Sequence, residues 1–319
     1  MSKRVKCGAL LASCAFALAP AAAMAAIVTQ WSYTTELQFL LGDDPGTTVV
    51  EAAPTFSAGT GTQTTTSSEL SWGQDGGTFR NPATEQPSDG GRSALTIGTS
   101  PIGATPPVYI GGGPVNGLVD TLVGGGVPTG SQVGSGPNLS HWNNPISAAF
   151  AELTSAWLKD TLTLTPTQPV PGASQDAPTL SFFFKFLETP NAGSGGVCEN
   201  GLPVPASGCG DLFGFDSTVL DSLNIPFAYG GEDYLLSVLV LNQDGTASPI
   251  GTLAPGECAA LGLPTGCQGF KTAEAARTTA HFAFSISTEP VFVPEPGTLA
   301  LLGLGLAGLG YARRRRTAA

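Results

Sequence analysis

Histidine is scarce in this chain of 319 residues, which contains only two, His141 and His281. A catalytic zinc site usually takes three protein ligands, often with an H-E-x-x-H pair, so two separated histidines argue against a zinc hydrolase. The G-x-S-x-G elbow of many serine hydrolases is absent as well. The sequence therefore assigns no catalytic residue and favours a protein that is not an enzyme.

Charged side chains are also scarce, at 12% of the chain against about 25% in typical globular proteins. With 43 glycines and 26 prolines, this composition argues against a helical bundle and favours many short strands joined by turns. Of the 13 lysines and arginines, seven lie within residues 3–6 and 313–316, whereas nearly all 24 acidic residues lie between these ends. Such an acidic body repels nucleic acid and anionic lipid and attracts divalent cations.

The N-terminus has the pattern of a secretory signal peptide, which we place at residues 1–26. A basic segment precedes an apolar run over residues 7–23, which ends in an A-x-A cleavage site at residues 23–25. An alternative remains open, because residues 11–14 resemble a lipoprotein box that would make Cys14 a lipidated N-terminus.

Near the other end, the chain has an apolar run over residues 299–309. This run follows Pro294, Glu295 and Pro296 and precedes four arginines: Arg313, Arg314, Arg315 and Arg316. Residues 296–312 just reach the roughly 17 to 25 residues that a bilayer-spanning helix needs. Because the arginines would stop transfer and stay on the cytoplasmic side, this segment predicts a C-terminal transmembrane helix.

The order of Pro-Glu-Pro, apolar run and arginine cluster resembles the PEP-CTERM sorting signal of Gram-negative bacteria, here at residues 293–316. The resemblance implies a partner, an exosortase, which is a membrane-embedded transpeptidase-like enzyme. It also implies export and release or re-anchoring at the cell surface, often alongside exopolysaccharide production. The apolar run would hold the precursor in the inner membrane, with the prolines keeping the recognition peptide extended. A plain tail anchor is the simpler alternative.

Four cysteines remain in the exported body: Cys198, Cys209, Cys258 and Cys267. An even number in an exported chain indicates two disulfides, which four cysteines can form in three ways. We expect the local pairing, which joins the first two and the last two and closes two short loops rich in Gly and Pro. A zinc site with four cysteine ligands is disfavoured, because neither pair has C-x2–4-C spacing.

Segments with period-two alternation recur along the body, bounded by Gly, Pro, Asn and Asp, and predict antiparallel strands. The clearest cover residues 27–40, 161–165, 179–188, 234–242 and 280–288. Two of them, 179–188 and 234–242, are apolar on both faces at their centres, so a second layer must cover them. The expected fold is therefore an all-β antiparallel β-sandwich, jelly-roll-like or similar, over residues 27–292.

Few helices are expected, and residues 147–157 are the best candidate for a short helix or turn. Residues 99–137 are rich in Gly and Pro, which predicts a long surface insert with little structure of its own. No clear internal repeat divides the chain, so the body is expected to form one domain.

Residues 140–146, the stretch SHWNNPI, combine turn formers with an aromatic ring and a hydroxyl. They predict a turn that the His141 ring holds against the sandwich in a structural role. The stretch resembles the motif of the THxN group of PEP-CTERM proteins, named for Thr-His-x-Asn, with Ser140 in place of Thr, followed by His141 and Asn143. The resemblance covers the body, residues 27–293, and implies no known activity.

Acidic residues also gather at several expected turns: Asp43, Asp44, Glu232, Asp233 and Asp244. None has the D-x-[DN]-x-[DN]-G spacing of a calcium loop, so the sequence assigns no metal ligand and no cofactor. Their simplest interpretation is that they are solvated turn residues. Calcium is the one cofactor that turn carboxylates and carbonyls would suit.

Together these features predict a non-enzymatic cell-surface or extracellular-matrix protein, sorted by an exosortase and associated with the envelope or with biofilm exopolysaccharide. One alternative is a carbohydrate- or calcium-binding module, in which exposed Trp31, Trp72 or Trp142 would stack on sugar rings. Another is an extracellular hydrolase that uses His141. The side chains around His141 would separate these alternatives.

Overall fold

The fold comes from a computed structural model of the chain, which describes residues 26–44, 50–215, 224–242, 245 and 250–291. Apart from Ala26, the expected signal peptide lies outside the described residues, and so does the expected sorting signal. Within the described ranges, no helix is both long and apolar enough to cross a membrane.

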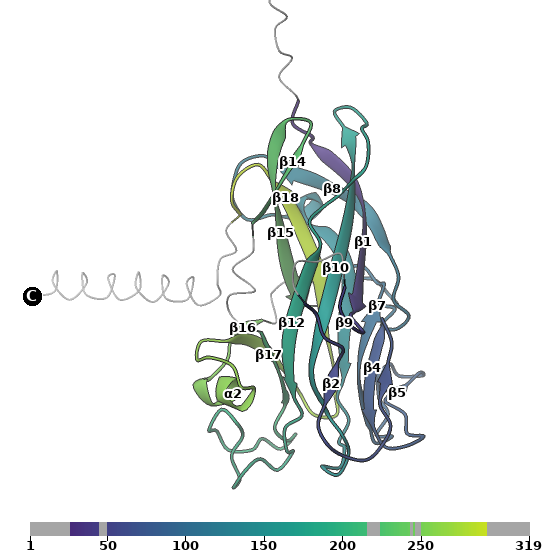
Figure 1. The fold of residues 1–319 in the computed structure, drawn as a ribbon, viewed down its shortest axis with the longest axis vertical. Coiled ribbons are helices and arrows are strands. Elements are labelled where there is room, and N and C mark those ends of the chain that lie inside the picture. Colours follow the sequence, from purple (N-terminus) through teal and green to yellow (C-terminus); the bar gives the residue numbers. More distant parts are fainter. Residues whose placement is uncertain (1–25, 45–49, 216–223, 243–244, 246–249, 292–319) are drawn as a thin grey trace, which may run out of the picture.

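Strands form nearly all of the regular structure, and most of them belong to one large sheet made of two halves (Figure 1). In order from its edge, the first half contains β16 (Gly251–Thr252), β17 (Gln268–Thr272), β13 (Asp211–Phe215), β12 (Leu180–Leu187), β10 (Leu153–Gln168), β1 (Gln30–Phe39) and β8 (Val115–Leu122). The short strands β2 (Thr55–Phe56) and β11 (Gln175–Asp176) add to β10. These pairings are all antiparallel.

The second half continues from β8 through a short parallel pairing with β18 (Arg277–Ser287). Beyond β18 follow β9 (Gly134–Trp142), β7 (Arg92–Gly98), β4 (Glu69–Gly73) and β3 (Thr64–Thr65), while β15 (Glu232–Asn242) and β14 (Ile225–Tyr229) extend from β18 on another path. Two further strands, β5 (Arg80–Asn81) and β6 (Gln86–Pro87), form a separate ribbon. The helical elements are the 3-10 turn η1 (Gly130–Gln132) and helix α2 (Pro255–Ala260).

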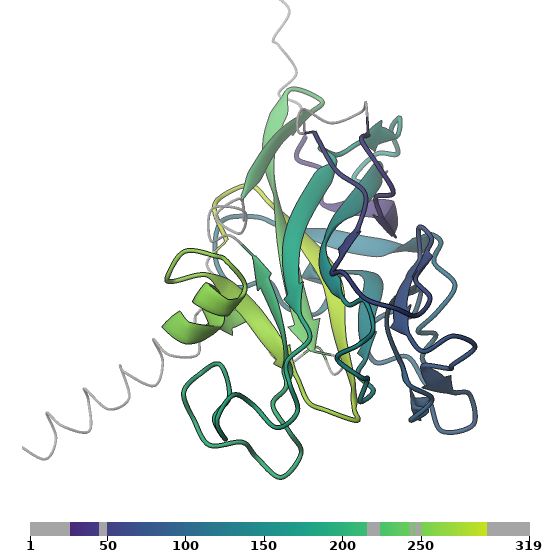
Figure 2. The same ribbon diagram turned by 60° about the horizontal axis from the view of Figure 1, so that its bottom comes forward.

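The two halves pack face to face around one main core, which makes the body a β-sandwich (Figures 1 and 2). The first half contributes Phe39, Leu158, Phe184 and Phe213, and the second contributes Trp72, Leu95, Ile97 and Phe282. Along β12, buried side chains alternate with partly exposed ones, as the period-two pattern requires. The expected all-β sandwich is confirmed, and all five of the clearest strand segments lie in strands.

Of two local expectations, one holds in part and the other was wrong. Residues 147–157 begin with a turn at Ser147 to Phe150 but form no helix, because Leu153 to Trp157 begin the long strand β10, which pairs with β1 and β12 and buries Leu153 and Leu158 in the core. Residues 99–137 are not a structureless insert, because they contain β8, which joins the two halves.

Gly117 on β8 lies under the Tyr33 ring, where a Cβ would meet the Tyr33 oxygen at 2.5 Å, so a larger residue would not fit there without a shift.

The disulfides are those expected from the sequence. Cys198 is bonded to Cys209 and Cys258 to Cys267. The second disulfide fixes α2 beside β17, where it packs with Leu212, Leu253 and Leu261 in a small apolar cluster. The first disulfide ties down the long loop between β12 and β13, which lies at the lower end of the sandwich in Figure 1.

Candidate functional site

Strand β9 includes Ser140 to Trp142, and the residues that follow, Asn143 to Pro145, do not form the expected turn. His141 pairs with Leu95 of β7 on one side and with Thr278 of β18 on the other, so hydrogen bonding on both edges keeps the segment extended. Neighbouring side chains on a strand point to opposite faces. His141 and Asn143 therefore share the face toward the other layer, whereas Trp142 packs on the opposite face. The H-x-N spacing thus places two polar side chains inside the sandwich.

The His141 ring lies in an aromatic cage with only 1% of the residue exposed. It stacks on Trp72 and meets the edges of Phe186 and Phe213. Its Nδ1 lies 2.8 Å from the Thr272 hydroxyl, whereas its Nε2 has no hydrogen-bond partner. Burial lowers the pKa of His141 to about 3, so the ring is neutral at physiological pH.

Three carboxyl groups gather on the other side of the ring. Glu188 directly follows β12, Asp211 begins β13 and Glu274 lies just after β17. Glu188 is partly exposed as a residue, but the three carboxyl groups are buried, with ligand oxygens within 4.8 Å of one another. The Oδ2 atom of Asp211 lies 3.8 Å from Nε2 of His141, which is too long for a hydrogen bond. We call these four residues the acid–histidine cluster.

Burial determines the charge state of this cluster. It raises the pKa of Glu188 and of Asp211 well above the ordinary range, and their mutual repulsion and that of Glu274 add to the effect. Burial also raises the pKa of Glu274 to about 7. Among the residues that the structure describes, no lysine or arginine forms an ion pair with these three carboxyl groups, and Lys271 pairs with Glu257 instead.

Hydrogen bonds from the surrounding scaffold orient the carboxyl groups. The Thr189 backbone N–H donates to Oδ1 of Asp211 at 2.9 Å, and Trp72 Nε1 donates to Glu188 at 3.1 Å. The Asn143 amide donates to Glu274 at 3.3 Å. Three buried atoms are left without a hydrogen-bond partner: His141 Nε2, Asn143 Oδ1 and Asp211 Oδ2. In His141, Asn143 and Asp211, one polar atom is therefore hydrogen-bonded to a neighbouring residue, and the other polar atom has no partner.

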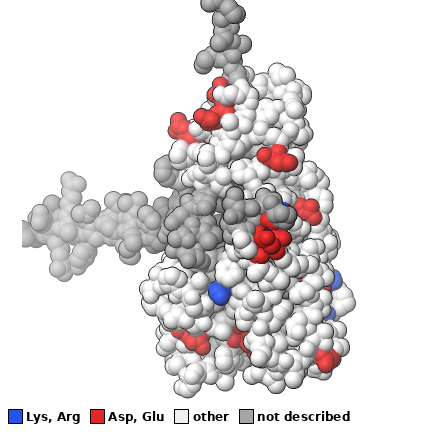
Figure 3. Space-filling model, in the orientation of Figure 1, with Lys and Arg blue, Asp and Glu red and all other residues white. Residues whose placement is uncertain are grey.

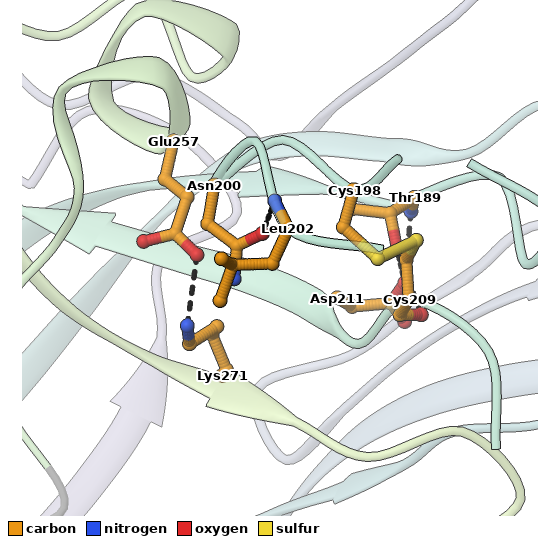
Figure 4. Close-up of a disulfide and its surroundings, with 8 residues drawn as sticks. All are labelled: Thr189, Cys198, Asn200, Leu202, Cys209, Asp211, Glu257 and Lys271. Carbon is orange, nitrogen blue, oxygen red and sulfur yellow. Dashed lines mark hydrogen bonds and ion pairs between the residues drawn. A yellow bond between two sulfur atoms is a disulfide. The ribbon is translucent and has the colours of Figure 1, made fainter. Parts of the chain in front are cut away.

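A groove of about 410 Å³ opens next to the cluster and is lined by Thr189, Cys209 and Thr272. Thr189 and Thr272 are the residues that hold Asp211 and His141, so the groove wall adjoins the cluster. Figure 4 shows Asp211 beside the Cys198–Cys209 disulfide, with the Glu257–Lys271 pair across the groove.

Two glycines allow the disulfide loop to lie close to the acid–histidine cluster. A Cβ on Gly210 would lie 2.5 Å from the Thr272 carbonyl oxygen, and one on Gly208 would lie 2.9 Å from Cγ of Glu274. Gly208 also has a φ of +89°, in the left-handed region that side chains disfavour. Larger residues at these two positions would push the disulfide loop away from the cluster.

Apart from Trp72, the remaining candidates from the sequence, namely the other tryptophans, His281 and Ser140, lie away from the acid–histidine cluster. Trp31, Trp72 and Trp142 are all fully buried, so none of them can stack on a sugar ring at the surface. His281 is buried in β18, but neither ring nitrogen has a hydrogen-bond partner, contrary to the expectation of a ring satisfied by a neighbour. Ser140 points away from the cluster and shares a hydrogen bond of 2.9 Å with Thr279.

The turn acids do not converge on one site. Asp44 forms an ion pair with Lys159, and Glu232 and Asp233 begin β15, while Asp244 lies outside the described residues. On the face shown in Figure 3, acidic side chains outnumber basic ones, which agrees with the acidic body expected from the sequence.

Sequence reasoning did not find Glu188, Asp211 and Glu274. They lie far apart in the chain, and no spacing rule links them to His141. Their one shared feature is that each lies at or next to the end of a strand, in β12, β13 or β17. That feature would have identified them only if the strand order had been known.

A known sorting signal follows the folded body of this chain. Residues 292–316 match the family model described as the PEP-CTERM protein-sorting motif. The chain therefore carries a PEP-CTERM sorting motif, which implies surface export and processing by an exosortase. The match confirms the resemblance seen in the sequence, and it covers the tail alone. A comparison of the chain with curated proteins finds no match.

Proposed function

We propose that the body of this chain is a non-enzymatic surface or matrix module, which an exosortase delivers to the envelope or to extracellular polysaccharide in a Gram-negative bacterium. The observation that carries the proposal is the direct connection between body and signal. Strand β18 ends at Ser287, and the matched sorting motif begins at residue 292. The sandwich is thus the cargo that this motif sorts, with no further domain between them.

The burial of His141 supports a role other than catalysis. A hydrolase would need substrate to reach this ring and a nucleophile beside it. The hydroxyl that contacts the ring belongs to Thr272, which is 0% exposed, and the ring itself is 1% exposed. Neither this groove nor the larger one of about 560 Å³ is lined by His141. Access for a substrate would require the two layers to separate.

We also infer that the body belongs to the THxN group. In this interpretation His141 and Asn143 are the paired inward residues of the motif, because both lie on one face of β9 and both contact groups of the acid–histidine cluster. The replacement of Thr by Ser140 keeps the hydroxyl, which bonds to Thr279 on the neighbouring strand.

Sorting can be tested by replacing Pro294, Glu295 and Pro296 with alanine in the full chain. The apolar run and the arginines stay intact, so the precursor should still insert but should no longer be recognised. The expected result is full-length protein retained in the membrane fraction, whereas the parent is shortened and found at the surface or in the medium. Immunoblots of cell fractions with a tag in the body provide the measurement.

The chain offers a matched control for this test, because Glu289 and Pro290 form the same dipeptide upstream of the matched motif and are exposed. Alanine at both positions should leave processing unchanged. If the alanine variant of the motif is shortened like the parent, the tail acts only as an anchor. If the parent does not co-fractionate with either envelope or extracellular polysaccharide, the matrix role is wrong.

A further inference from the structure

We propose that Glu188, Asp211, Glu274 and His141 bind one divalent transition-metal ion, of the Zn²⁺ or Mn²⁺ type, between the two layers of the sandwich. The site would hold the end of β9 to the ends of β12, β13 and β17. This inference goes beyond the proposed function, since it depends on the folded body and not on the sorting signal.

The distances suit a single ion. Donor atoms that bind one ion at about 2.0 to 2.6 Å lie no more than roughly 5 Å apart. The oxygens of the three carboxyl groups lie within 4.8 Å of one another. The Nε2 atom of His141 lies 3.8 Å from Oδ2 of Asp211, which is suitable for two ligands side by side on one ion. No nitrogen of His141 belongs to the group of mutually close ligand atoms that the three carboxyl groups form, so the ring would have to move toward an ion that they bind.

The strongest argument is that His141 and Asp211 each have one polar atom with a hydrogen-bond partner and one buried polar atom without. His141 contacts Thr272 through Nδ1 and leaves Nε2 without a partner, although the ring is almost fully buried. Asp211 accepts the Thr189 N–H at Oδ1 and leaves Oδ2 without a partner, at 0% exposure. Buried polar atoms rarely stay unpaired in a folded protein. A metal ion between Nε2 and Oδ2 would satisfy both.

The hydrogen bonds around the cluster have the arrangement found around protein metal ligands. Such ligands commonly bond to the scaffold through their second polar atom, which fixes the orientation of the first. Thr272 does this for His141, and Thr189 does it for Asp211. Trp72 holds Glu188, and Asn143 holds Glu274. Asn143 and Trp72 are thus positioning residues in this proposal.

The donor set selects the class of metal. A neutral imidazole with several carboxylates suits borderline ions such as Zn²⁺ and Mn²⁺, whereas Ca²⁺ prefers six to eight oxygen ligands. Among the described residues, no lysine or arginine forms an ion pair with these three carboxyl groups, so the ion would supply a positive charge there. The groove of about 410 Å³ approaches the cluster at Thr189 and Thr272, the hydrogen-bond partners of Asp211 and His141.

The test is metal analysis of the full chain, exported to the periplasm and purified in detergent. After removal of bound metal with EDTA, the protein is dialysed against Zn²⁺, Mn²⁺ or Ca²⁺, and bound metal is measured by mass spectrometry. We expect about one Zn²⁺ or Mn²⁺ per chain and a higher melting temperature with the ion. Asp211→Asn and His141→Gln should each bind at least tenfold less metal and lose the shift in melting temperature.

Two matched controls come from the same sandwich. His281→Gln changes the other buried histidine, whose two ring nitrogens lack hydrogen-bond partners, and Asp160→Asn changes a partly buried acid with a raised pKa. Both should bind metal like the parent. Equal loss of metal from His281→Gln and His141→Gln would overturn the site.

Metal binding by the parent protein tests the proposal even if a cluster variant does not fold. A parent that retains none of the three ions after dialysis overturns the proposal. A parent that retains Ca²⁺ but neither Zn²⁺ nor Mn²⁺ overturns the class of metal assigned here. Circular dichroism and intact disulfides of Asp211→Asn, together with loss of metal, support the proposal because the fold is then kept while the ion is lost.

Discussion

Single polar side chains between the strands also respond to burial, and Asp160, a partly buried residue, shows this away from the acid–histidine cluster. Its carboxyl group accepts a hydrogen bond of 2.8 Å from the Thr35 hydroxyl on the neighbouring strand β1. Burial raises the pKa of Asp160 to about 7, although the bond from Thr35 opposes this rise. In an unfolded chain an aspartate ionises near about 3.9. The folded state therefore keeps a proton that the unfolded chain has already lost.

The sign of the pH dependence follows from this difference. The stability that Asp160 contributes should be fully present below about pH 4, should fall as the pH rises, and should be lost above about pH 7. The free-energy difference between the parent and Asp160→Asn should change by up to about 4 kcal/mol across this window. Glu274 titrates in both proteins, so its effect cancels in the difference.

Urea unfolding of both proteins at several pH values between about 4 and 8 measures this difference. A difference that stays constant with pH would show that the Asp160 carboxyl is ionised in the folded protein. Thr35→Val serves as a control, because loss of the hydrogen bond should raise the folded pKa of Asp160 and move the window to higher pH.

At the scale of elements, the short helix α2 depends on its disulfide. Six residues are too few for an isolated helix to be stable in water, so α2 is held by packing and by the covalent link. Cys258 and Cys267 are almost fully buried against Leu212, Leu253 and Leu261. The disulfide thus closes a loop and also contributes to an apolar cluster.

Replacing both Cys258 and Cys267 with serine should lower the free energy of unfolding by more than the roughly 2.7 kcal/mol of the loop-entropy model. The loss of unfolding free energy should exceed that value because two serine hydroxyls would be buried without hydrogen-bond partners. Chemical denaturation provides the measurement. The double serine variant of Cys198 and Cys209 is the comparison, because its loop is similar in length and Cys198 is partly exposed, so its loss should be smaller. Equal losses in the two variants would contradict the packing argument.

At the scale of the whole molecule, the two halves of the sheet share one core. Among the described residues, strand pairing connects them only at the short parallel pairing of β8 with β18, so they are held together by the core between the layers and by side-chain hydrogen bonds such as that from Trp72 to Glu188. Side chains such as Phe184 on β12 and Leu95 on β7 belong to the same cluster. Neither layer could keep its apolar face in water without the other.

The body should therefore unfold in one cooperative transition. Phe184→Ala in the first half and Leu95→Ala in the second should each destabilise that transition, by about 3–5 and about 2–5 kcal/mol respectively. Differential scanning calorimetry checks this expectation by comparing the calorimetric and van't Hoff enthalpies. Two separate transitions, with each variant shifting only one of them, would mean that the halves fold independently.

Patterns among residues close together in the sequence determined several features of this protein. Strand-like segments at residues 179–188 and 234–242 predicted β12 and β15, the short loops predicted the pairing of Cys198 with Cys209, and the order of the tail predicted the sorting motif. These features depend on residues close together in the chain, where spacing alone fixes which groups can meet.

Only the tertiary structure decided the rest. The sequence around His141 favoured a turn, but pairing with β7 and β18 on both edges made it a strand and turned the ring inward. Glu188, Asp211 and Glu274 meet because β12, β13 and β17 are neighbours in the sheet with aligned ends. Strand order and register depend on the packing of the whole core between the two layers. No local pattern encodes them, and so the acid–histidine cluster appears only in the folded chain.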